Sequence, residues 1–277
     1  MKIYNTTKGV LIETQNSFYL INKNWDDFIN NDNLLEKLNQ LVLSLNPIEN
    51  AEEIIKNNLL VPMQSQELWA SGVTYYNSKL GRQEESKDAG GGDYYERVYN
   101  ADRPELFFKA TVNRTVSSGG KLNIRKDSTW DVPEPELTLV ITSSGKIIGY
   151  TIGNDMSSRS IEGKNPLYLP QAKTYDACAG LGPCVLVSDE MLSHDSKISM
   201  KIIRNTEIIF DETTEISKMK RKPKELVNYL YKECSFKYGS LLMTGTGIVP
   251  TTAFTLQSKD EIQISIDSIG TLINYVR

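Results

Sequence analysis

Histidine and cysteine are scarce in this chain of 277 residues, which has a single histidine and three cysteines. A metal site built from imidazole and thiolate ligands is therefore nearly excluded. The cysteines Cys178, Cys184 and Cys234 are odd in number and widely spaced, so we expect reduced thiols and a cytoplasmic protein. The histidine, His194, stands in a charged stretch that is typical of a surface turn, and we assign it no role.

An excess of basic residues and long apolar runs are also missing. The chain has 31 Lys and Arg against 35 Asp and Glu, which gives a net charge of −4 and a pI near 5.3. This composition offers no basic surface for nucleic acid. No apolar run approaches the ~20 residues that a membrane helix needs, and residues 1–5 lack the pattern of a signal peptide. The hydrophobic content of 39% is typical of a soluble globular protein, and we expect no nucleic-acid or membrane partner.

The distribution of apolar residues predicts an α+β fold that is mostly β. Short β-rich runs predict strands at residues 9–12, 17–21, 106–109, 137–141, 147–152, 184–187, 198–203, 241–243 and 261–266. Helical periodicity predicts helices at residues 34–42 and 223–232. We expect a small N-terminal α+β accessory domain at residues 1–65 and a catalytic domain at residues 66–277, with the boundary just after Pro62.

A polar, glycine-rich stretch interrupts the second domain between Gly81 and Asp102. It contains many charges and three consecutive glycines at positions 90–92. We expect residues 79–96 to form a mobile loop that orders over a bound ligand, with the glycines as its hinge. A surface loop with no role is an equally good interpretation.

Two glutamates before a predicted strand carry the strongest chemical signal. Glu134 and Glu136 are two residues apart, so an extended chain turns both to one face. A hairpin about Ser144-Gly145 would place Glu136 near Gly153 and Glu134 near Asp155. The three carboxylates then converge at one end of the hairpin. Taken alone, the Glu-x-Glu pair is usually a solvated strand edge, and Asp155 shifts the balance toward a cation site.

Carboxylate ligands favour hard cations, so we expect Mg²⁺ at Glu134, Glu136 and Asp155, with Mn²⁺ or Ca²⁺ as possible substitutes. An octahedral ion would keep about three positions for water or substrate. Gly245 and Thr246 follow an apolar strand in a Thr-Gly-Thr-Gly turn. Its amides and hydroxyls could hold the carboxylate of a substrate, although turns of this kind are common.

In combination, these residues resemble the signature of the fumarylacetoacetate hydrolase family. Its Glu-x-Glu is followed here by Asn154-Asp155, by Lys-x-x-Asp at residues 173–176, by Gly182-Pro183 and by the Thr-Gly-Thr at residues 244–246. The resemblance covers about residues 68 to 277. It implies a fumarylacetoacetate-hydrolase-like C-terminal catalytic domain, Mg²⁺ on the three carboxylates, a small-molecule 2-oxo acid that chelates the ion, and a homodimer or homotetramer.

One departure from the family pattern bears on the reaction. The family's hydrolases have a Gly-x-Asn-Tyr-x-x-His motif whose histidine activates water, whereas this chain ends the same segment in Ser78. The chain is more similar to the branch of the family that dehydrates 2-keto-3-deoxy sugar acids. That resemblance implies catalytic roles for Lys173 and Glu105, and we expect Ser78 and Arg82 to bind substrate.

Dehydration of a 2-keto-3-deoxy pentonate would give 2,5-dioxopentanoate and water, a step of pentose degradation. It needs an electron sink, a base for the C3 proton and an acid for the C4 hydroxyl. Lys173 could be the base and Glu105 the acid, or the reverse. The alternatives are a plain salt bridge for Lys173 and an ordinary strand-end acid for Glu105. Rival functions are an acylpyruvate hydrolase or oxaloacetate decarboxylase on the same metal site, and a non-catalytic 2-oxo-acid-binding protein.

Overall fold

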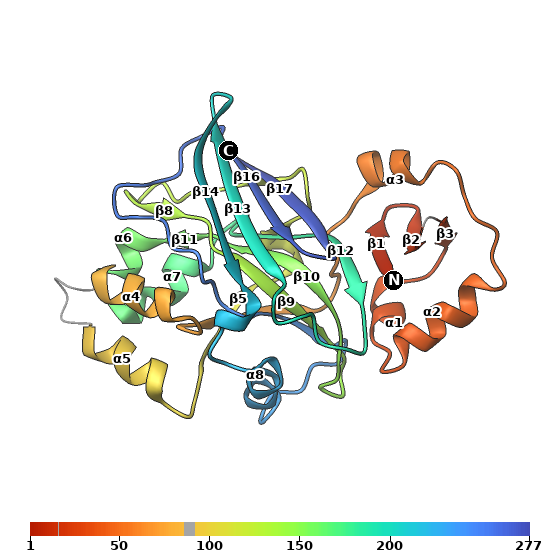
Figure 1. Ribbon diagram of the computed structural model, residues 1–277, viewed down its shortest axis with the longest axis horizontal. Coiled ribbons are helices and arrows are strands. Elements are labelled where there is room, and N and C mark those ends of the chain that lie inside the picture. The colour runs from red at the N-terminus through yellow and green to blue at the C-terminus, as the bar shows by residue number, and fades with distance from the viewer. Residues whose placement is uncertain (16, 86–91) are drawn as a thin grey trace.

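The computed structural model describes residues 1–15, 17–85 and 92–277, and most of its strands belong to two large sheets (Figure 1). The ten-stranded sheet runs in the order β3 (Ser17–Ile21), β2 (Gly9–Thr14), β1 (Lys2–Thr6), β12 (Ala179–Val187), β10 (Ile147–Asp155), β9 (Pro135–Ile141), β15 (Ser240–Met243), β4 (Glu67–Gly72) and β5 (Glu105–Ala110), with β6 (Thr115–Val116) paired to β12. The five-stranded sheet runs in the order β14 (Glu207–Glu215), β13 (Lys197–Arg204), β16 (Glu261–Ile266), β17 (Gly270–Val276) and β7 (Lys121–Leu122). A small ribbon pairs β11 (Ser157–Ser158) with β8 (Asp131–Val132).

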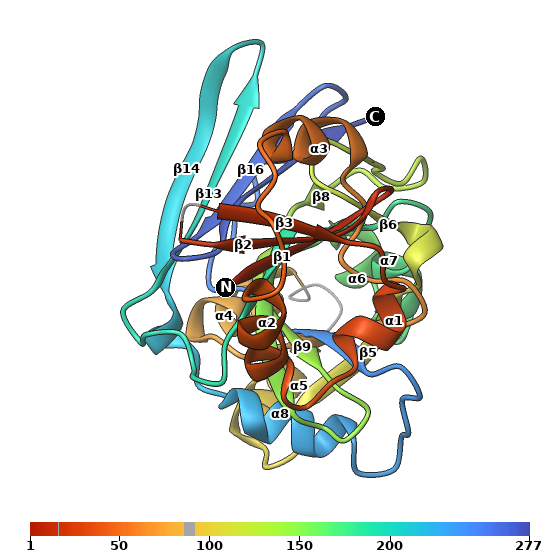
Figure 2. The ribbon, with the colours of Figure 1, turned by 90° about the vertical axis from the view of Figure 1, so that its right-hand side faces the viewer.

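Helices are short and lie around the sheets (Figures 1 and 2). They are α1 (Trp25–Ile29), α2 (Leu34–Val42), α3 (Ala51–Asn58), α4 (Tyr76–Glu85), α5 (Gly92–Asn100), α6 (Arg159–Glu162), α7 (Leu169–Lys173) and α8 (Pro223–Leu230), with 3₁₀ turns η2 (Val112–Arg114), η3 (Pro166–Tyr168) and η4 (Ile216–Lys218). In Figure 1, α4 to α7 gather at the end of the molecule opposite to α1–α3. The expected α+β fold with a majority of strands is confirmed.

The side-chain alternation of β9 divides the core. Leu137, Leu139 and Ile141 pack in the cluster that also holds residues of β13 and β16, whereas Val140 packs in a second cluster with residues of β1 and β2. Every residue of β9 is buried, because layers cover both faces of this central strand. Glu136 is on the same face as Val140, so this strand places a carboxylate inside the protein.

Residues 1–65 hold β1–β3 and α1–α3, which gather at one end of the molecule in Figure 1. The expected strands at residues 9–12 and 17–21 and the helix at residues 34–42 are confirmed. β1 pairs with β12, with Lys2 opposite Leu186 and Ile3 opposite Val185. The large sheet therefore continues from this region into the rest of the chain, and the proposed domain boundary near residue 65 stays a prediction.

The predicted hairpin is confirmed. In the β9–β10 pairing, Gly153 is opposite Glu136, and the Asp155 amide donates a 3.0 Å hydrogen bond to the Glu134 carbonyl. Gly145 closes the turn with a φ of +84°, a conformation that glycine adopts without the clash of a Cβ. The ends of the two strands thus bring Glu134, Glu136 and Asp155 to one place.

The expected loop at residues 79–96 is wrong for its described part, which is helical. α4 ends at Glu85 and α5 begins at Gly92, while residues 86–91, with Gly90 and Gly91, lie outside the described residues. The helical period was hidden because the buried face of α4 is polar, with Ser78, Lys79 and Arg82 turned inward. Closure of this segment over a ligand stays a prediction.

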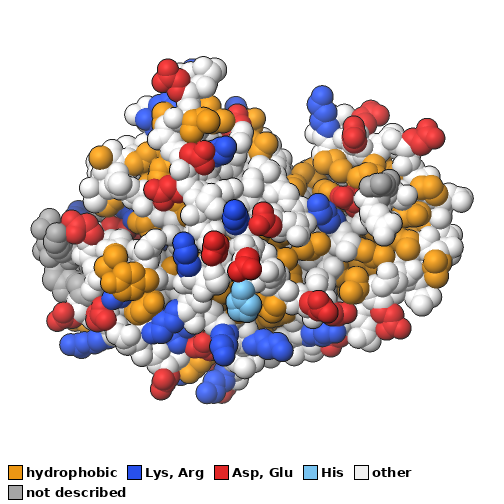
Figure 3. Space-filling model, viewed as in Figure 1, with side chains coloured by type: hydrophobic (Ala, Val, Ile, Leu, Met, Phe, Trp, Pro, Cys, Tyr) orange, Lys and Arg blue, Asp and Glu red, His pale blue; other side chains and the backbone are white. Residues whose placement is uncertain are grey.

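On the face shown in Figure 3, Lys and Arg side chains alternate with Asp and Glu side chains. The two kinds of charge are nearly equal in number in the sequence, with a slight excess of acidic residues. Among the helices of the described ranges, none combines the length and the apolar character that crossing a membrane requires.

Candidate active site

Three carboxylates meet inside the protein at the end of the β9–β10 hairpin. Glu134, Glu136 and Asp155 each offer an oxygen, and these oxygens all lie within 4.8 Å of one another. The residues are only 5%, 1% and 1% exposed, respectively, so the solvated strand-edge interpretation is wrong. The predicted convergence is confirmed, and a cavity of about 10 Å³ lies among them, with room for about one water-sized sphere.

Each of the three carboxylates has at least one oxygen in a hydrogen bond or ion pair with a residue of another element. These pairs are Glu134 Oε1 with the Arg159 guanidinium at 3.0 Å, Glu136 Oε2 with the Gly245 amide, and Asp155 Oδ1 with the Lys109 ammonium at 2.6 Å. The donors come from α6, from the turn after β15 and from β5. The carboxylates are therefore oriented by surrounding structure as well as by their own strands.

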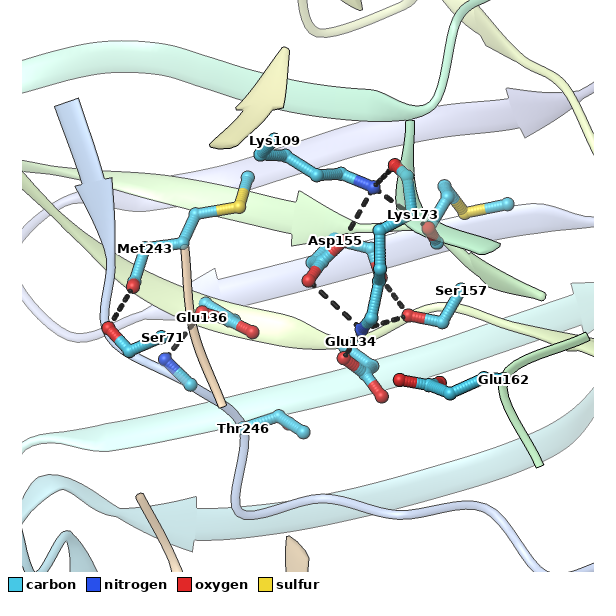
Figure 4. A network of polar contacts seen from close by, with 12 residues as sticks. Ser71, Lys109, Glu134, Glu136, Asp155, Ser157, Glu162, Lys173, Met243 and Thr246 are labelled. Atoms are coloured by element: carbon cyan, nitrogen blue, oxygen red, sulfur yellow. Dashed lines mark hydrogen bonds and ion pairs between the residues drawn. The ribbon is translucent and has the colours of Figure 1, made fainter. Parts of the chain in front are cut away.

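Lys173, the last residue of α7, points its ammonium at the same site (Figure 4). Its Nζ donates to Glu134 Oε2 at 2.6 Å, to Asp155 Oδ2 at 3.1 Å and to Ser157 Oγ at 2.6 Å. The side chain is 1% exposed. An ammonium has three donors, and all three are used here, two of them by carboxylates that line the cavity.

The charges in the site shift one another's pKa values in opposite directions. Burial acts to raise the pKa of Glu134, but the positive charges of Lys173, Arg159 and Arg82 outweigh it and hold this pKa well below its usual range. The pKa of Glu136 is raised well above its ordinary value by burial and by the carboxylates of Asp155 and Glu134. Burial acts to lower the pKa of Lys173, but Asp155 and Glu134 raise it overall. The site therefore has a carboxylate that lacks a compensating positive charge.

The residues fit a divalent metal ion. The three oxygens that converge are carboxylate donors, which hard cations such as Mg²⁺ prefer. Their mutual repulsion, visible in the raised pKa of Glu136, is what a cation among them would remove. Glu134, Glu136 and Asp155 are the residues that could hold it, and the small cavity between them has the size of an ion or a water molecule.

Arg82 and Glu105 line a second, larger cavity near the three-carboxylate site. Arg82 lines both, and the larger cavity, of about 510 Å³, is also lined by Glu105, Tyr95 and Leu169. This volume is in the range of small-molecule sites. The Glu105 carboxyl lies against Gly72, where an added Cβ would fall 2.1 Å from Oε2. Within the described part of the chain, this buried Oε2 has no hydrogen-bond partner.

Three of the four expected substrate-binding residues, Ser78, Arg82 and Thr246, line the small cavity, but the hydroxyls of Ser78 and Thr246 have other partners. Ser78 Oγ donates to the Tyr75 carbonyl at 2.7 Å and accepts from the Tyr75 amide at 3.2 Å. Thr246 Oγ1 donates to the Ile248 carbonyl at 3.1 Å. These hydroxyls hold the backbone at the start of α4 and after β15, so their role toward a substrate stays a prediction.

The Gly245 amide, which we expected to hold a substrate carboxylate, has a partner within the chain, and its role toward a substrate stays a prediction. This amide donates to Oε2 of Glu136, a carboxylate of the chain itself. Gly245 has a φ of +90°, and an added Cβ would fall 2.0 Å from the Thr74 hydroxyl, so glycine is required for this turn. The turn therefore supports the three-carboxylate site.

Several charged residues of the site were missed in the sequence. Lys109 is fully buried, Arg159 bridges Glu134 to Glu85 of α4, and Glu162 of α6 pairs with Arg82. Lone charges beside apolar residues give little signal in a sequence, because most charged residues lie at the surface. The position of Lys109 in the apolar strand β5 is the one hint that it is buried.

The fold and the three-carboxylate site together define a class. The model of the fumarylacetoacetate (FAA) hydrolase C-terminal domain matches residues 76–277, and the chain belongs to this family. The family resemblance drawn from the sequence is thus confirmed. The departure at Ser78 remains, since the structure gives this position a backbone-capping contact rather than a base.

Within the family, the chain is similar to sugar-acid dehydratases. It is 48% identical over 226 residues to the "probable 2-keto-3-deoxyxylonate dehydratase" of Haloferax volcanii, covering 81% of this chain and 77% of the relative. It is 43% identical over 218 residues to the 2-dehydro-3-deoxy-D-arabinonate dehydratase of Saccharolobus solfataricus, covering 78% and 73%. A solved structure of 2-keto-3-deoxy-D-arabinonate dehydratase complexed with magnesium and 2,5-dioxopentanoate superposes with a TM-score of 0.86 at 34% identity, over 100% of this chain and 99% of the other.

Proposed function

We propose that the protein is an Mg²⁺-dependent dehydratase that converts 2-keto-3-deoxy-D-arabinonate, or a pentonate of the same class, to 2,5-dioxopentanoate and water in pentose degradation. The observation that carries this proposal is the three-carboxylate site, with Lys173 held on two of its members and Glu105 beside the adjoining cavity. The names of the relatives and the ligands of the similar structure support the choice of substrate class.

Glu134, Glu136 and Asp155 would hold the ion through one oxygen each. When bound, Mg²⁺ supplies a Lewis acid beside the carboxylate and 2-oxo oxygen of the substrate, which reduces the cost of negative charge there as a C3 proton leaves. The chain contributes preorganisation, because each carboxylate is buried and has an oxygen fixed by a residue from another element. With three protein ligands, about three octahedral positions are left for substrate and water.

Glu105 and Lys173 divide the proton transfers. We assign Glu105 as the base for the C3 proton, because its buried Oε2 accepts no hydrogen bond from the described residues. We assign Lys173 as the acid for the C4 hydroxyl, because acidic neighbours favour its ammonium form. The C3–H and C4–O bonds break, a C3–C4 double bond forms, and the hydroxyl leaves as water. A proton then leaves C5 and one returns to C3, which gives a C4–C5 enol. Loss of the enol hydroxyl proton and protonation of C4 give the 5-aldehyde.

The surroundings of Ser78 speak against carbon–carbon hydrolysis. Hydrolysis needs a base placed on a water molecule, and the family's hydrolases use a histidine at this position. The Ser78 hydroxyl hydrogen is instead committed to the Tyr75 carbonyl at 2.7 Å. The single histidine of the chain, His194, is exposed in the loop before β13. No histidine is therefore available to the site within one chain.

A substrate panel tests the reaction type. Purified protein with Mg²⁺ would be incubated with 2-keto-3-deoxy pentonates, a 2-keto-3-deoxy hexonate, an acylpyruvate and oxaloacetate, and products identified by mass. Loss of water from a pentonate is the expected result. Hydrolysis of the acylpyruvate or loss of CO₂ from oxaloacetate, with the pentonates untouched, would establish one of the rival enzymes. Binding of a 2-oxo acid without turnover of any compound would establish the non-catalytic alternative.

The assembly and location of the protein complete the proposal. The resemblance to the family leads us to propose a homodimer or homotetramer in the cytoplasm. β14, an edge strand of the five-stranded sheet, has mostly exposed residues, and the β13–β14 hairpin extends beyond the rest of the molecule in Figure 2. Light scattering of the purified protein would measure the number of subunits.

A further inference from the structure

Lys109 is a fully buried lysine that contacts Asp155 of the three-carboxylate site from the side away from the small cavity. The side chain is 0% exposed, and Lys109 is not among the described residues that line the small cavity. Its ammonium contacts three oxygens: Asp155 Oδ1 at 2.6 Å, the Met156 carbonyl at 2.9 Å and the Lys173 carbonyl. The two carbonyl contacts are hydrogen bonds and the Asp155 contact is an ion pair, so the ammonium has three oxygen partners although Lys109 itself lies outside the described lining of the small cavity.

Two lysines divide the oxygens of Asp155 between them. Lys109 contacts Oδ1 at 2.6 Å, while Lys173 contacts Oδ2 at 3.1 Å. Figure 4 shows the two ammonium groups on different sides of this carboxylate. Lys173 lines the small cavity, so Oδ2 is the oxygen on the cavity side. Oδ1 is paired with the Lys109 ammonium, which is buried and cannot reach solvent.

A carboxylate with one committed oxygen can offer a metal ion only the other. Mg²⁺ accepts this readily, because it requires near-ideal octahedral geometry at short distances, which both oxygens of one carboxylate would distort. Ca²⁺ takes six to eight oxygens and commonly uses both oxygens of a carboxylate. Restricting Asp155 to one oxygen therefore disfavours the larger ion more than the smaller one.

We propose that Lys109 is a positioning residue that makes Asp155 a one-oxygen ligand and so favours Mg²⁺ over Ca²⁺. This inference rests on the proposed ion site, and it goes beyond it by naming what sets the choice of ion. Glu136 likewise has one oxygen held, by the Gly245 amide. Glu134 has one oxygen on Arg159 and the other on Lys173, the lysine that lines the small cavity. Ca²⁺ is thus expected to bind weakly to the wild-type protein.

Lys109→Met and Lys173→Met form a matched pair for the test. Each removes one buried positive charge in contact with Asp155, and each therefore changes the attraction for both ions by a similar amount. They differ in which oxygen is released. Only Lys109→Met frees Oδ1, so only this variant allows Asp155 to bind with both oxygens.

The experiment is calorimetric titration of chelator-treated protein with MgCl₂ and with CaCl₂, without substrate. We expect the ratio of the Ca²⁺ Kd to the Mg²⁺ Kd to fall by about tenfold or more in Lys109→Met, the range in which outer contacts of metal ligands act. The ratio should keep its wild-type value in Lys173→Met. An unchanged ratio in Lys109→Met, or an equal fall in both variants, would overturn the inference.

Crystals of the wild-type protein soaked with CaCl₂ provide a test that does not depend on the folding of a variant. We expect Asp155 to contact the ion through Oδ2 alone, with Oδ1 still on Lys109. Contact through both oxygens, or Ca²⁺ binding as tight as Mg²⁺ binding, would overturn the inference. Neither measurement uses substrate, so a protein that prefers Mg²⁺ yet dehydrates no sugar acid would sink the proposed reaction and leave the role of Lys109 standing.

Discussion

The Lys173 ammonium lies 2.6 Å from Oε2 of Glu134, which places the proposed proton donor directly on a proposed metal ligand. Both groups are buried, so neither can turn to solvent for an alternative partner. A divalent ion among the carboxylates would compete with Lys173 for the charge of Glu134. The protonation of the lysine and the occupancy of the ion site are therefore linked, and each should be measurable through the other.

Replacing Lys173 by methionine should abolish dehydration while the fold survives. Methionine keeps the length of the side chain in a fully buried position but removes the ammonium from Glu134, Asp155 and Ser157. We expect the rate to fall by ~10²–10⁴-fold, the usual contribution of an acid–base group. Mg²⁺ binding should persist, because the ion's three carboxylates are intact. Rates of 2,5-dioxopentanoate formation and titration with MgCl₂ measure the two effects.

The control for this substitution is Lys201→Met. Lys201 pairs with Asp211 at 3.4 Å between half-exposed strands β13 and β14, far in sequence from the site. An exposed pair of this kind contributes little to stability, so we expect the variant to have the activity and the free energy of unfolding of the wild-type protein. Substantial turnover by the Lys173→Met variant would remove this lysine from the mechanism.

Replacing Glu105 by glutamine should remove the base. The buried Oε2 of Glu105 has no donor among the described residues, and glutamine keeps the shape of the side chain without the capacity to accept a proton. We expect a loss of ~10²–10⁴-fold in dehydration. In D₂O, the C3 hydrogens of the substrate should stop exchanging in Glu105→Gln but continue to exchange in Lys173→Met. Nuclear magnetic resonance of the substrate reports this exchange, and the opposite pattern would reverse the two roles.

The difference between Glu136 and Lys109 shows what can be read from the sequence. The pairing of the β9–β10 hairpin at its far end agrees with a fold about Ser144-Gly145, with Gly153 opposite Glu136. The register shift between Ile147 and Gly149 that produces this pairing was not foreseen. It followed that Glu136 and Asp155 converge. The contact of Lys109 with Asp155 was not predictable, since it depends on how β5 and α7 pack across the end of the hairpin, and 46 residues separate the two in sequence from β5 to β10.

The same reasoning explains the helix that was missed. Part of the segment expected to be a loop is the helix α4, which was missed because its inward face carries Lys79 and Arg82 rather than apolar residues. Arg82 is balanced by Glu162, and Lys79 pairs with Glu96 at 2.7 Å. A helix whose buried face is charged has no apolar period. Such faces become visible only when their partners, which are distant in sequence, are in place.

Ser78→Ala should affect stability more than chemistry. The Ser78 hydroxyl accepts from the Tyr75 amide and donates to its carbonyl, which fixes the first turn of α4. Loss of such a cap costs about 0.5–2 kcal/mol in the free energy of unfolding. We expect this cost in urea unfolding, with turnover reduced by less than about tenfold. A loss of activity as large as that of Lys173→Met, with stability unchanged, would mean that the hydroxyl takes part in the reaction.

The metal-free protein should lose stability as the pH rises, and Mg²⁺ should restore it. The pKa of Glu136 in the folded protein is raised well above its ordinary value of 4.5 by burial and by Asp155 and Glu134. The folded state therefore keeps a proton that the unfolded chain releases, and stability falls with pH from about 4.5 upward, by at most about 1.4 kcal/mol per pH unit for one proton. Melting temperatures measured in chelator between about pH 5 and pH 8 follow this loss.

Glu136→Gln separates this effect from other titrations. It should flatten the fall of the melting temperature with pH in chelator, while part of the slope remains because burial also raises the pKa values of Glu85 and Asp131. Saturating Mg²⁺ should stabilise the wild-type protein most at high pH, where an ion no longer competes with the proton. The variant should gain nothing from Mg²⁺ and should be inactive. A variant that still binds Mg²⁺ tightly and turns over substrate would show that Glu136 is not a ligand, because the amide cannot supply the charge that the ion requires.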